Sequence, residues 1–246
     1  MVNGLYTAAA SMINLQKKQD IASHNLSNMN TTGFKLSKLI TKTEVTIKRN
    51  DEAKLHQDEE QSLNEVVRDF SGGALVQTDN DLDLALSDSG FFKIMTPDGV
   101  RYTRNGAFSL NSLGELVTLN GHPVLQDNDD TVHLENNEKL TVASDGGLFV
   151  QGAKIGQIGV VNFETNKPLL SEGKGYYNNT DPVNNPARVT HEASLKQGYL
   201  EGSNVDVIRT MVEMISQFRN YEASQKTMHA IDETVQKAVN EIGRVS

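Results

Sequence analysis

The stretch from Val205 to Ile242 constrains the fold most, because it contains neither proline nor glycine. Apolar residues recur along it in alternate steps of three and four, the spacing of a helix stripe that faces a partner helix. At a rise of roughly 1.5 Å per residue, such a helix would extend about 57 Å. We therefore expect one long C-terminal helix, capped by Ser203 or Asn204, with Asp206 in its first turn.

The N-terminal stretch shows the same periodicity, and it ends at a cluster of turn-forming residues between Asn25 and Gly33. Neither stripe can bury itself alone, so we expect the two terminal helices to pack together. Gln19, Gln225 and Asp232 are polar interruptions of the two stripes. The stripe residues, which we interpret as an assembly interface, are Leu5, Ala8, Met12, Leu15, Ala22, Leu26, Val207, Met211, Met214, Phe218, Tyr221, Met228, Val235, Val239 and Ile242.

Between the two helices the sequence has a different pattern, made of short β-prone segments separated by turn signals such as Asn105-Gly106 and Asn120-Gly121. This spacing is typical of an antiparallel β domain. The clearest candidate strands are Leu82 to Leu86, Phe91 to Met95, Glu115 to Leu119, Lys139 to Ala143 and Gly156 to Phe163.

The predicted fold is mostly β with terminal α: an antiparallel β domain inserted between N- and C-terminal helices that pair as a coiled-coil-like α domain. We expect a discontinuous helical polymerisation domain (1–35 and 200–246), an extended linker (36–69) and a β domain (70–199). Within the linker, residues 48–65 are charged, and a poorly packed helical segment is an alternative there. An alternative for the helices is that they cover one face of the β domain.

Composition excludes several classes of function. The net charge of −9 is spread without a long block of one sign, so no nucleic-acid face is expected. The absence of cysteine rules out disulfides, thiolate catalysis and cysteine-ligated metals. The chain has no run of about 18 apolar residues, so no membrane span is expected. Its first residues lack the basic and apolar regions of a cleavable signal peptide, so no such peptide is expected either.

Three motifs resemble chemical sites and fail on inspection. His191-Glu192 begins like a zinc-protease helix, but Leu195 stands where the second histidine is required. The alternating Asp79, Asp81 and Asp83 lack the glycine and the glutamate of a calcium loop. The glycines at 152, 156 and 159 lack phosphate-loop spacing and indicate bulges or close strand approach. We therefore predict a non-enzymatic protein with no catalytic, cofactor or metal site.

Both ends of the chain, and its middle, carry motifs of a known family. They are Gly4-Leu5-Tyr6-Thr7-Ala8-Ala9, the stretch from Asn25 to Lys35, Leu82-Asp83-Leu84-Ala85, the stretch from Tyr102 to Phe108, and the stretch from Leu200 to Asp206. Together these segments resemble the bacterial flagellar rod and hook family, most closely its rod proteins of the FlgF and FlgG type. The signature residues on which the resemblance depends are Asn25, Asn28, Gly33, Phe34, Gly202, Ser203, Asn204, Val205 and Arg219.

The resemblance implies a structural subunit of the flagellar basal body that crosses the cell envelope. It implies that the terminal segments line a hollow, torque-transmitting shaft while the β domain lies outside it, and that export follows the type III route. The implied partners are further copies, other rod and hook subunits, the export apparatus and ring proteins. A hook-type subunit, or a β module that binds peptidoglycan or ring proteins, is the alternative. Arg209-Thr210, Phe218 and Asn220 depart from the family pattern, which affects the expected lateral contacts.

Overall fold

The computed structural model describes residues 2–44, 61–134, 139–190 and 194–242. The chain divides into two compact units. The first, which we call the helical unit, contains both helices and the first two strands. The second, which we call the β unit, comprises Asn28–Leu36 and Asp69–Val205. The chain passes from one unit to the other at four points, namely 27/28, 36/37, 68/69 and 205/206.

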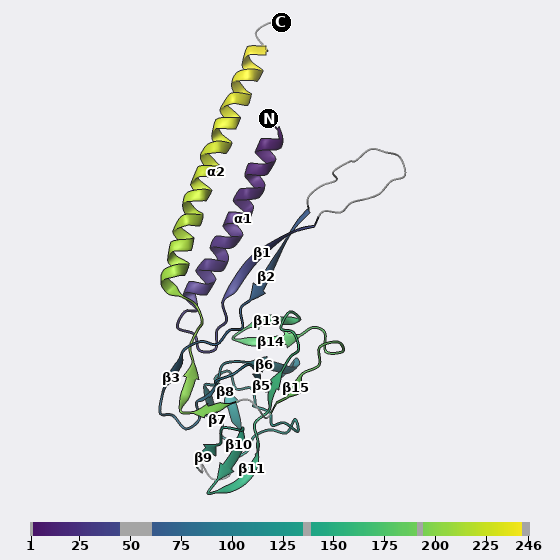
Figure 1. Ribbon diagram of the computed structural model, residues 1–246, viewed down its shortest axis with the longest axis vertical. Coiled ribbons are helices and arrows are strands. Elements are labelled where there is room, and N and C mark those ends of the chain that lie inside the picture. Colours follow the sequence, from purple (N-terminus) through teal and green to yellow (C-terminus); the bar gives the residue numbers. More distant parts are fainter. Residues whose placement is uncertain (1, 45–60, 135–138, 191–193, 243–246) are drawn as a thin grey trace, which may run out of the picture. The chain divides into compact units, whose positions relative to one another are not determined.

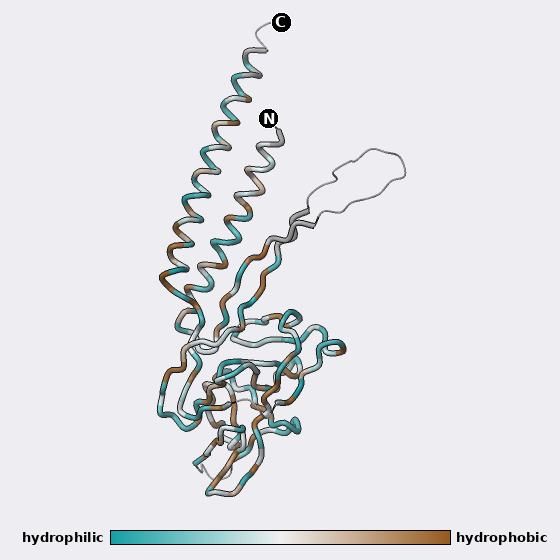
Figure 2. Tube along the Cα trace, in the orientation of Figure 1, coloured by the Kyte–Doolittle hydropathy of each residue, from teal (hydrophilic) through white to brown (hydrophobic). Residues whose placement is uncertain are grey.

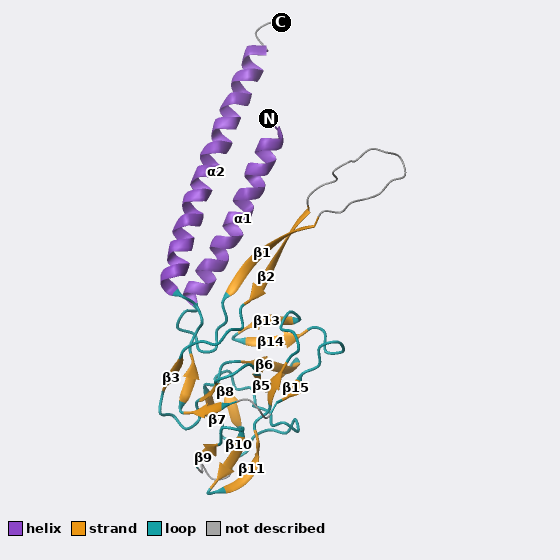
Figure 3. Ribbon diagram, viewed as in Figure 1, coloured by secondary structure: helices purple, strands orange, loops and turns teal. Residues whose placement is uncertain are grey.

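The helical unit is built on α1 (Val2–Ser27) and α2 (Val207–Ile242), which pack against each other (Figure 1). They are antiparallel, since α1 begins beside the second half of α2 (Figure 1), where a Cβ placed on Gly4 would lie 3.7 Å from Ile231. Strands β1 (Ser37–Glu44) and β2 (Gln61–Arg68) form an antiparallel pair, and β1 contacts α1 (Figure 3). The predicted packing of the two terminal helices is confirmed.

The two helix ends show how local sequence sets the boundaries. α1 ends at Ser27, within the predicted cluster of turn formers. α2 begins one residue after Asp206, whose Oδ1 accepts a hydrogen bond from the Arg209 backbone amide at 3.0 Å. Asp206 is therefore the N-cap. The prediction of Ser203 or Asn204 as the cap was wrong, because both residues precede the helix as part of the β unit.

The predicted linker contains the β1–β2 pair in its described residues. Ser37 lies opposite Arg68 and Glu44 opposite Gln61, with an unbroken register between them. Residues 61–65 thus belong to a strand, so the helical alternative was wrong for them, while residues 48–60 lie outside the described part. Repeated β-branched residues explain the preference for an extended pair over a helix.

The β unit consists of short antiparallel strands, as the turn spacing predicted. One sheet has six strands in the order β13-β14-β6-β5-β12-β15, and the other described strands of the unit form one three-stranded and three two-stranded sheets. The strands are β3 (Leu75–Gln77), β4 (Leu84–Leu86), β5 (Phe91–Thr96), β6 (Gly99–Thr103), β7 (Phe108–Leu110), β8 (Leu116–Thr118), β9 (Leu140–Val142), β10 (Gly147–Val150), β11 (Ala153–Gln157), β12 (Val160–Asn162), β13 (Leu169–Gly173), β14 (Tyr176–Asn179), β15 (Arg188–Val189), β16 (Leu195–Gln197) and β17 (Tyr199–Glu201).

The core of the β unit lies on both faces of β5. Phe92 and Ile94 point into the larger cluster of buried apolar side chains, while Phe91 points into a second, smaller cluster. This alternation follows from the two-residue period of a strand, and burial of both faces explains why the neighbouring Phe91 and Phe92 are both apolar. In the smaller cluster Phe91 meets Phe70 edge to face, with ring centroids 5.4 Å apart.

The predicted strand from Gly156 to Phe163 is in fact two strands, β11 and β12. Glycine explains the division. A Cβ on Gly156 would collide with the Gln126 side chain, and one on Gly159 would lie 2.6 Å from the Gln126 carbonyl oxygen. The predicted close approach of another segment is therefore confirmed for Gly156 and Gly159. Gly152 instead has a φ of +83° and open space around it.

Candidate functional site: the helix pair and the clasp

The seam between the helices is formed by half-buried side chains spaced three and four residues apart. On α1 these positions are the predicted ones, and Ala22 is the most buried of them at 6% exposure. They are Ala8, Met12, Leu15, Gln19, Ala22 and Leu26. The side chain of Leu5 lies outside the described residues.

On α2 the seam differs from the predicted stripe at every second position. Four of the predicted residues lie in it, together with four others, so the seam consists of Val207, Thr210, Met214, Gln217, Tyr221, Ser224, Met228 and Ile231. Gln225 and Asp232 do not interrupt it, because they are exposed and the seam passes through Ser224 and Ile231 instead. The apolar pattern misled because α2 is hydrophobic on more than one side near its start (Figure 2).

Met211 and Phe218, predicted on the stripe, lie on a second face of α2 and are 42% and 49% exposed. Three further apolar residues share that face, because successive residues of a helix turn by about 100°. We call this face the ridge, and it comprises Ile208, Met211, Val212, Ile215 and Phe218. Val235 is 37% exposed, and the side chains of Val239 and Ile242 lie outside the described residues.

The seam also contains polar side chains. Gln19 and Gln217 are both half-buried, and the Oε1 atom of Gln217 is buried without a hydrogen-bond partner. A buried amide oxygen left unpaired costs roughly 1–3 kcal/mol. The helix pair is therefore held by a thin, partly polar seam.

Signature residue Asn25 acts inside the helical unit. Its side chain is 3% exposed, and its Nδ2 donates to the Ser37 carbonyl oxygen at 2.8 Å. The Ser37 backbone amide donates back to the Asn25 Oδ1 at 2.9 Å. The amide thus reproduces the two hydrogen bonds of a strand partner and fixes the end of α1 to the start of β1.

In the β unit, three charged side chains that are distant in sequence meet in a buried cluster. The Lys35 Nζ lies 2.6 Å from the Glu201 Oε1, and the Arg104 Nη1 lies 3.3 Å from the Glu201 Oε2. Their side chains are at most 3% exposed. We call Lys35, Arg104 and Glu201, together with Asn204, the clasp.

Backbone groups complete the clasp. The Gly73 amide donates to the Glu201 Oε1 at 2.8 Å, and the Lys35 ammonium donates to the Ser71 carbonyl at 2.7 Å. The Arg104 guanidinium donates to the Asp88 carbonyl at 2.8 Å, although its Nε atom has no partner. The Glu201 carboxylate therefore has both cations and an amide around it, which offsets the cost of its burial.

Burial dominates the electrostatics of the two cations. Removal from water lowers the pKa of the Lys35 ammonium, and the hydrogen bond and attraction from Glu201 offset part of that effect. The pKa of Arg104 is also lowered by burial, against attraction from Glu201. Without Glu201, both cations would lose the carboxylate that pairs with them directly.

Asn204 joins three of the four points where the chain enters or leaves the β unit. Its Oδ1 accepts from the Leu36 amide at 2.8 Å, and its Nδ2 donates to the Asp69 carbonyl at 2.8 Å. The Asp69 amide in turn donates to the Leu36 carbonyl at 2.8 Å. Asn204 itself lies one residue before Val205, where the chain leaves the β unit. One side chain therefore connects three of the four points at which the chain passes between the units.

Gly33 allows the turn in which it lies to approach the clasp closely. Its φ is +67°, and an added Cβ would stand 2.5 Å from the Asn105 backbone nitrogen. Its amide donates to the Glu201 carbonyl at 2.7 Å. Only glycine combines this backbone conformation with this contact.

The remaining signature residues have simpler roles. The Asn28 carbonyl accepts from the Thr31 amide, the Phe34 amide donates to the Thr31 carbonyl, and the Gly202 amide donates to the Ala74 carbonyl. The Ser203 Oγ accepts from the amide of the buried Val205, while Arg219 is exposed on α2.

Lys35, Arg104 and Glu201 all lie in the family motifs of the sequence, but the sequence did not predict that they pair. The available signal was their setting, since each stands between uncharged neighbours in a short turn-rich motif.

The described residues contain no group of three or more metal-binding side chains. His191 to Ala193, the failed zinc motif, lie outside the described residues, and Asp79 and Asp81 are exposed. Within the described part, no helix has the length and apolarity required to cross a bilayer.

Comparison with protein families matches three consecutive parts of the chain. Residues 5–35 match the flagella basal body rod protein family, residues 85–162 the flagellar hook protein FlgE/F/G D1 domain, and residues 196–241 the flagellar basal body rod FlgEFG protein C-terminal family. The outer two matches contain Lys35 and Glu201, and the middle one contains Arg104. Each member of the buried ion cluster thus comes from a different family segment.

Whole-length relatives agree. The chain is 32% identical to the flagellar basal-body rod protein FlgF of Caulobacter vibrioides over 100% of both chains. It is 32% identical to the flagellar hook-basal body complex protein FlhO of Bacillus subtilis, again over 100% of both. It is 31% identical to the flagellar basal-body rod protein FlgG of Bacillus subtilis over 98% of this chain and 99% of the relative. The chain belongs to the flagellar basal-body rod protein family.

Proposed function

We propose that this chain is a non-enzymatic structural subunit of the flagellar rod, which assembles with copies of itself and with other rod and hook subunits through its terminal helices. The observation that carries the proposal is similarity over the full length to proteins named basal-body rod proteins. Its site would be the basal body, where the rod crosses the cell envelope as a hollow, torque-transmitting shaft. Export by the type III route, without a cleavable signal peptide, is part of the same proposal.

The helical unit supports assembly through helices. The seam positions of both helices alternate in steps of three and four, which is the spacing of a coiled coil. Outside the seam, α2 still exposes the ridge, and exposed apolar side chains in a row are typical of an interaction surface. We therefore assign the polymerisation role to the helices of the predicted segments 1–35 and 200–246. The outer position of the β domain is the part of the proposal that rests on the family resemblance alone.

A deletion of the gene in the bacterium that encodes the chain tests the proposal. We expect basal bodies purified from the deletion strain to lack a complete rod in electron micrographs, and the cells to be non-motile. The wild-type chain restored on a plasmid should be found in the basal bodies by mass spectrometry and should restore motility. Complete rods and normal swimming in the deletion strain would exclude the proposed function.

A matched pair of variants then tests the helices. Met214→Asp places a charge in the seam, and Gln225→Asp places the same charge on an exposed position of the same helix. Only the first is expected to abolish incorporation into basal bodies. Equal incorporation of both variants would contradict assembly through the helix pair while leaving membership of the rod untouched.

A further inference from the structure

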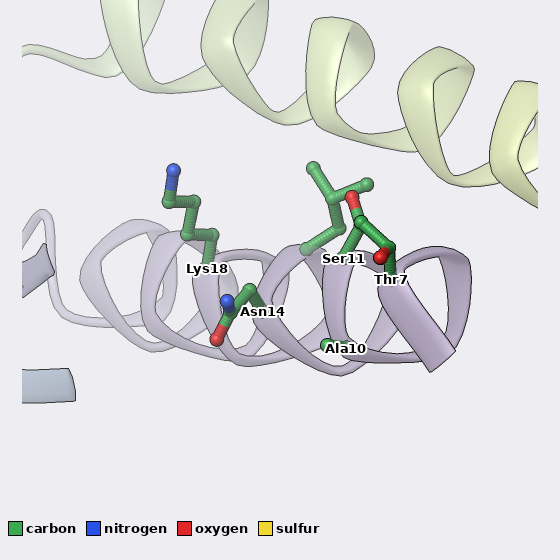
Figure 4. A pocket seen from close by; sticks show the side chains of 6 residues that line it. Thr7, Ala10, Ser11, Asn14 and Lys18 are labelled. Atoms are coloured by element: carbon green, nitrogen blue, oxygen red, sulfur yellow. The ribbon is translucent and has the colours of Figure 1, made fainter. Parts of the chain in front are cut away.

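The ridge of α2 has a counterpart on α1. A groove of about 360 Å³ runs along one side of α1, lined by Thr7, Ala10, Ser11, Asn14, Leu15 and Lys18 (Figure 4). Three of these side chains, those of Thr7, Ala10 and Ser11, are small and exposed. The groove is therefore an open depression beside the seam, on the flank of the helix pair.

The ridge and the groove differ in the size of their side chains. The ridge carries five large apolar side chains, of which Ile208 is 78% exposed and Val212 is 61% exposed. Bulky side chains on one helix pack best where the facing helix has small ones, because the helix axes can then approach each other. Burial of the ridge would be favoured by roughly 25 cal/mol per Å² of apolar surface.

Within one chain the ridge cannot reach the groove. The contact between Gly4 and Ile231 sets the register, so residue 11 of α1 lies level with about residue 224 of α2. Ile215, near the middle of the ridge, is about nine residues away, which is roughly 14 Å along the axis at 1.5 Å per residue. The ridge also faces away from the seam. A ridge that fills this groove can therefore come only from another copy of the chain.

We infer that the ridge of one copy packs into the α1 groove of a second copy, with the two copies displaced by roughly 14 Å along the helix axis. The inference rests on the proposed function and specifies the surface that the subunits use. The two surfaces in contact are different, so the contact is heterologous and leaves a free ridge at one end and a free groove at the other. Contacts of this kind produce an open polymer with a direction, as an axial shaft requires.

Cysteine cross-linking tests this contact without background, because the chain has no cysteine. In the double variant Ser11→Cys/Ile215→Cys the two sites within one chain are too far apart for a disulfide, whose Cα atoms must lie within about 7 Å. A disulfide can form only between copies. The matched control is Ser11→Cys/Ser216→Cys, since Ser216 is exposed at nearly the same level but lies off the ridge.

We expect oxidation of basal bodies that contain the first variant to give a ladder of covalent oligomers of this chain, at least tenfold stronger than with the control. If both variants enter basal bodies and the first gives no more cross-linked product than the control, the ridge does not pack into the groove. That result would leave the rod function intact. Absence of the wild-type chain from basal bodies would instead remove the proposed function itself.

A second pair of variants keeps the test valid if cross-linking chemistry is inefficient. Ile215→Asp charges the ridge, and Ser216→Asp introduces the same charge beside it. We expect at least a tenfold loss of the Ile215→Asp chain from basal bodies, with the Ser216→Asp chain retained and the helix signal of both purified monomers unchanged. Equal retention of the two variants would overturn the inference.

Discussion

The β unit and the helical unit bury their side chains to very different degrees. The β unit contains two clusters of almost fully buried apolar residues, including Phe92, Leu116 and Leu148. Along the described residues of the two helices, Ala22 is the only apolar side chain that is almost fully buried. Burial is the main favourable term in folding, so burial within one chain stabilises the β unit more strongly than the helix pair. Under the proposed function, the β unit provides a scaffold and the helical unit a surface for assembly.

The largest expected effect is that of a substitution in the clasp, which should lower the stability of the β unit. Glu201→Gln removes the carboxylate that two buried cations share, and loss of one partner of a buried ion pair costs about 3–5 kcal/mol. We expect a loss of this size in the free energy of unfolding of the β unit, measured by near-UV circular dichroism in urea. Glu164→Gln is the control, because Glu164 is 70% exposed in its pair with Arg188. Equal stability of the two variants would show that the clasp does not hold the β unit together.

Backbone geometry gives the next effect. Gly33→Ala places a Cβ against the Asn105 backbone at a positive φ, and we expect destabilisation on the order of 3 kcal/mol. Gly121→Ala is the matched control, since Gly121 has a φ of +81° and nothing within 4 Å of an added Cβ. It should cost only about 1–2 kcal/mol, the price of the conformation alone. A thermal melt of each variant separates steric contact from backbone strain, and identical melts would argue against the close approach.

A pair of methionines sharpens the distinction within the helical unit. Met214 lies half-buried in the seam, while Met211 lies on the ridge at 42% exposure. Met214→Ala should lower the stability of the helix pair by about 1–2 kcal/mol, less than the 2–5 kcal/mol of a fully buried site. Met211→Ala should change it by less than about 0.5 kcal/mol. Melting of the monomer, followed by far-UV circular dichroism at 222 nm, measures both. If Met211→Ala were the more damaging variant, the assignment of seam and ridge would be reversed.

The same two methionines show how far the sequence predicts this fold. Periodicity predicted two helices that pack together, because steps of three and four are visible in one chain. It placed Met211 and Phe218 on the seam, since the start of α2 is apolar on two adjacent sides and the choice between them is made by packing against α1. Sequence also predicted the antiparallel strands from turn residues.

The clasp could not be predicted in this way. Lys35 and Glu201 are 166 positions apart, and a single sequence contains no signal that pairs distant charges. The resemblance identified the motifs in which they lie, but only the fold brings those motifs to one place. The Asp206 cap was missed for a related reason, because Ser203 and Asn204 have the right chemistry for a cap and are used elsewhere.

The smallest expected effect concerns an exposed ion pair of the β unit, and it tests whether surface charges matter there beside the clasp. The Arg101 Nε lies 2.6 Å from the Glu172 Oε2, and this hydrogen bond lowers the pKa of Glu172 below its ordinary value of 4.5. A carboxyl group with a lowered pKa in the folded state contributes stability above its unfolded pKa, and that contribution is lost as the pH falls through the folded value. We therefore expect wild type to melt slightly above Arg101→Ala at pH 6, and the difference to shrink as the pH falls below about 4.5 and to vanish once the pH is below the folded value. Water and salt screen the pair, so the difference at pH 6 should also shrink in 1 M sodium chloride. A difference that persisted in acid and in salt would mean that Arg101 acts by packing against its neighbours rather than through its charge.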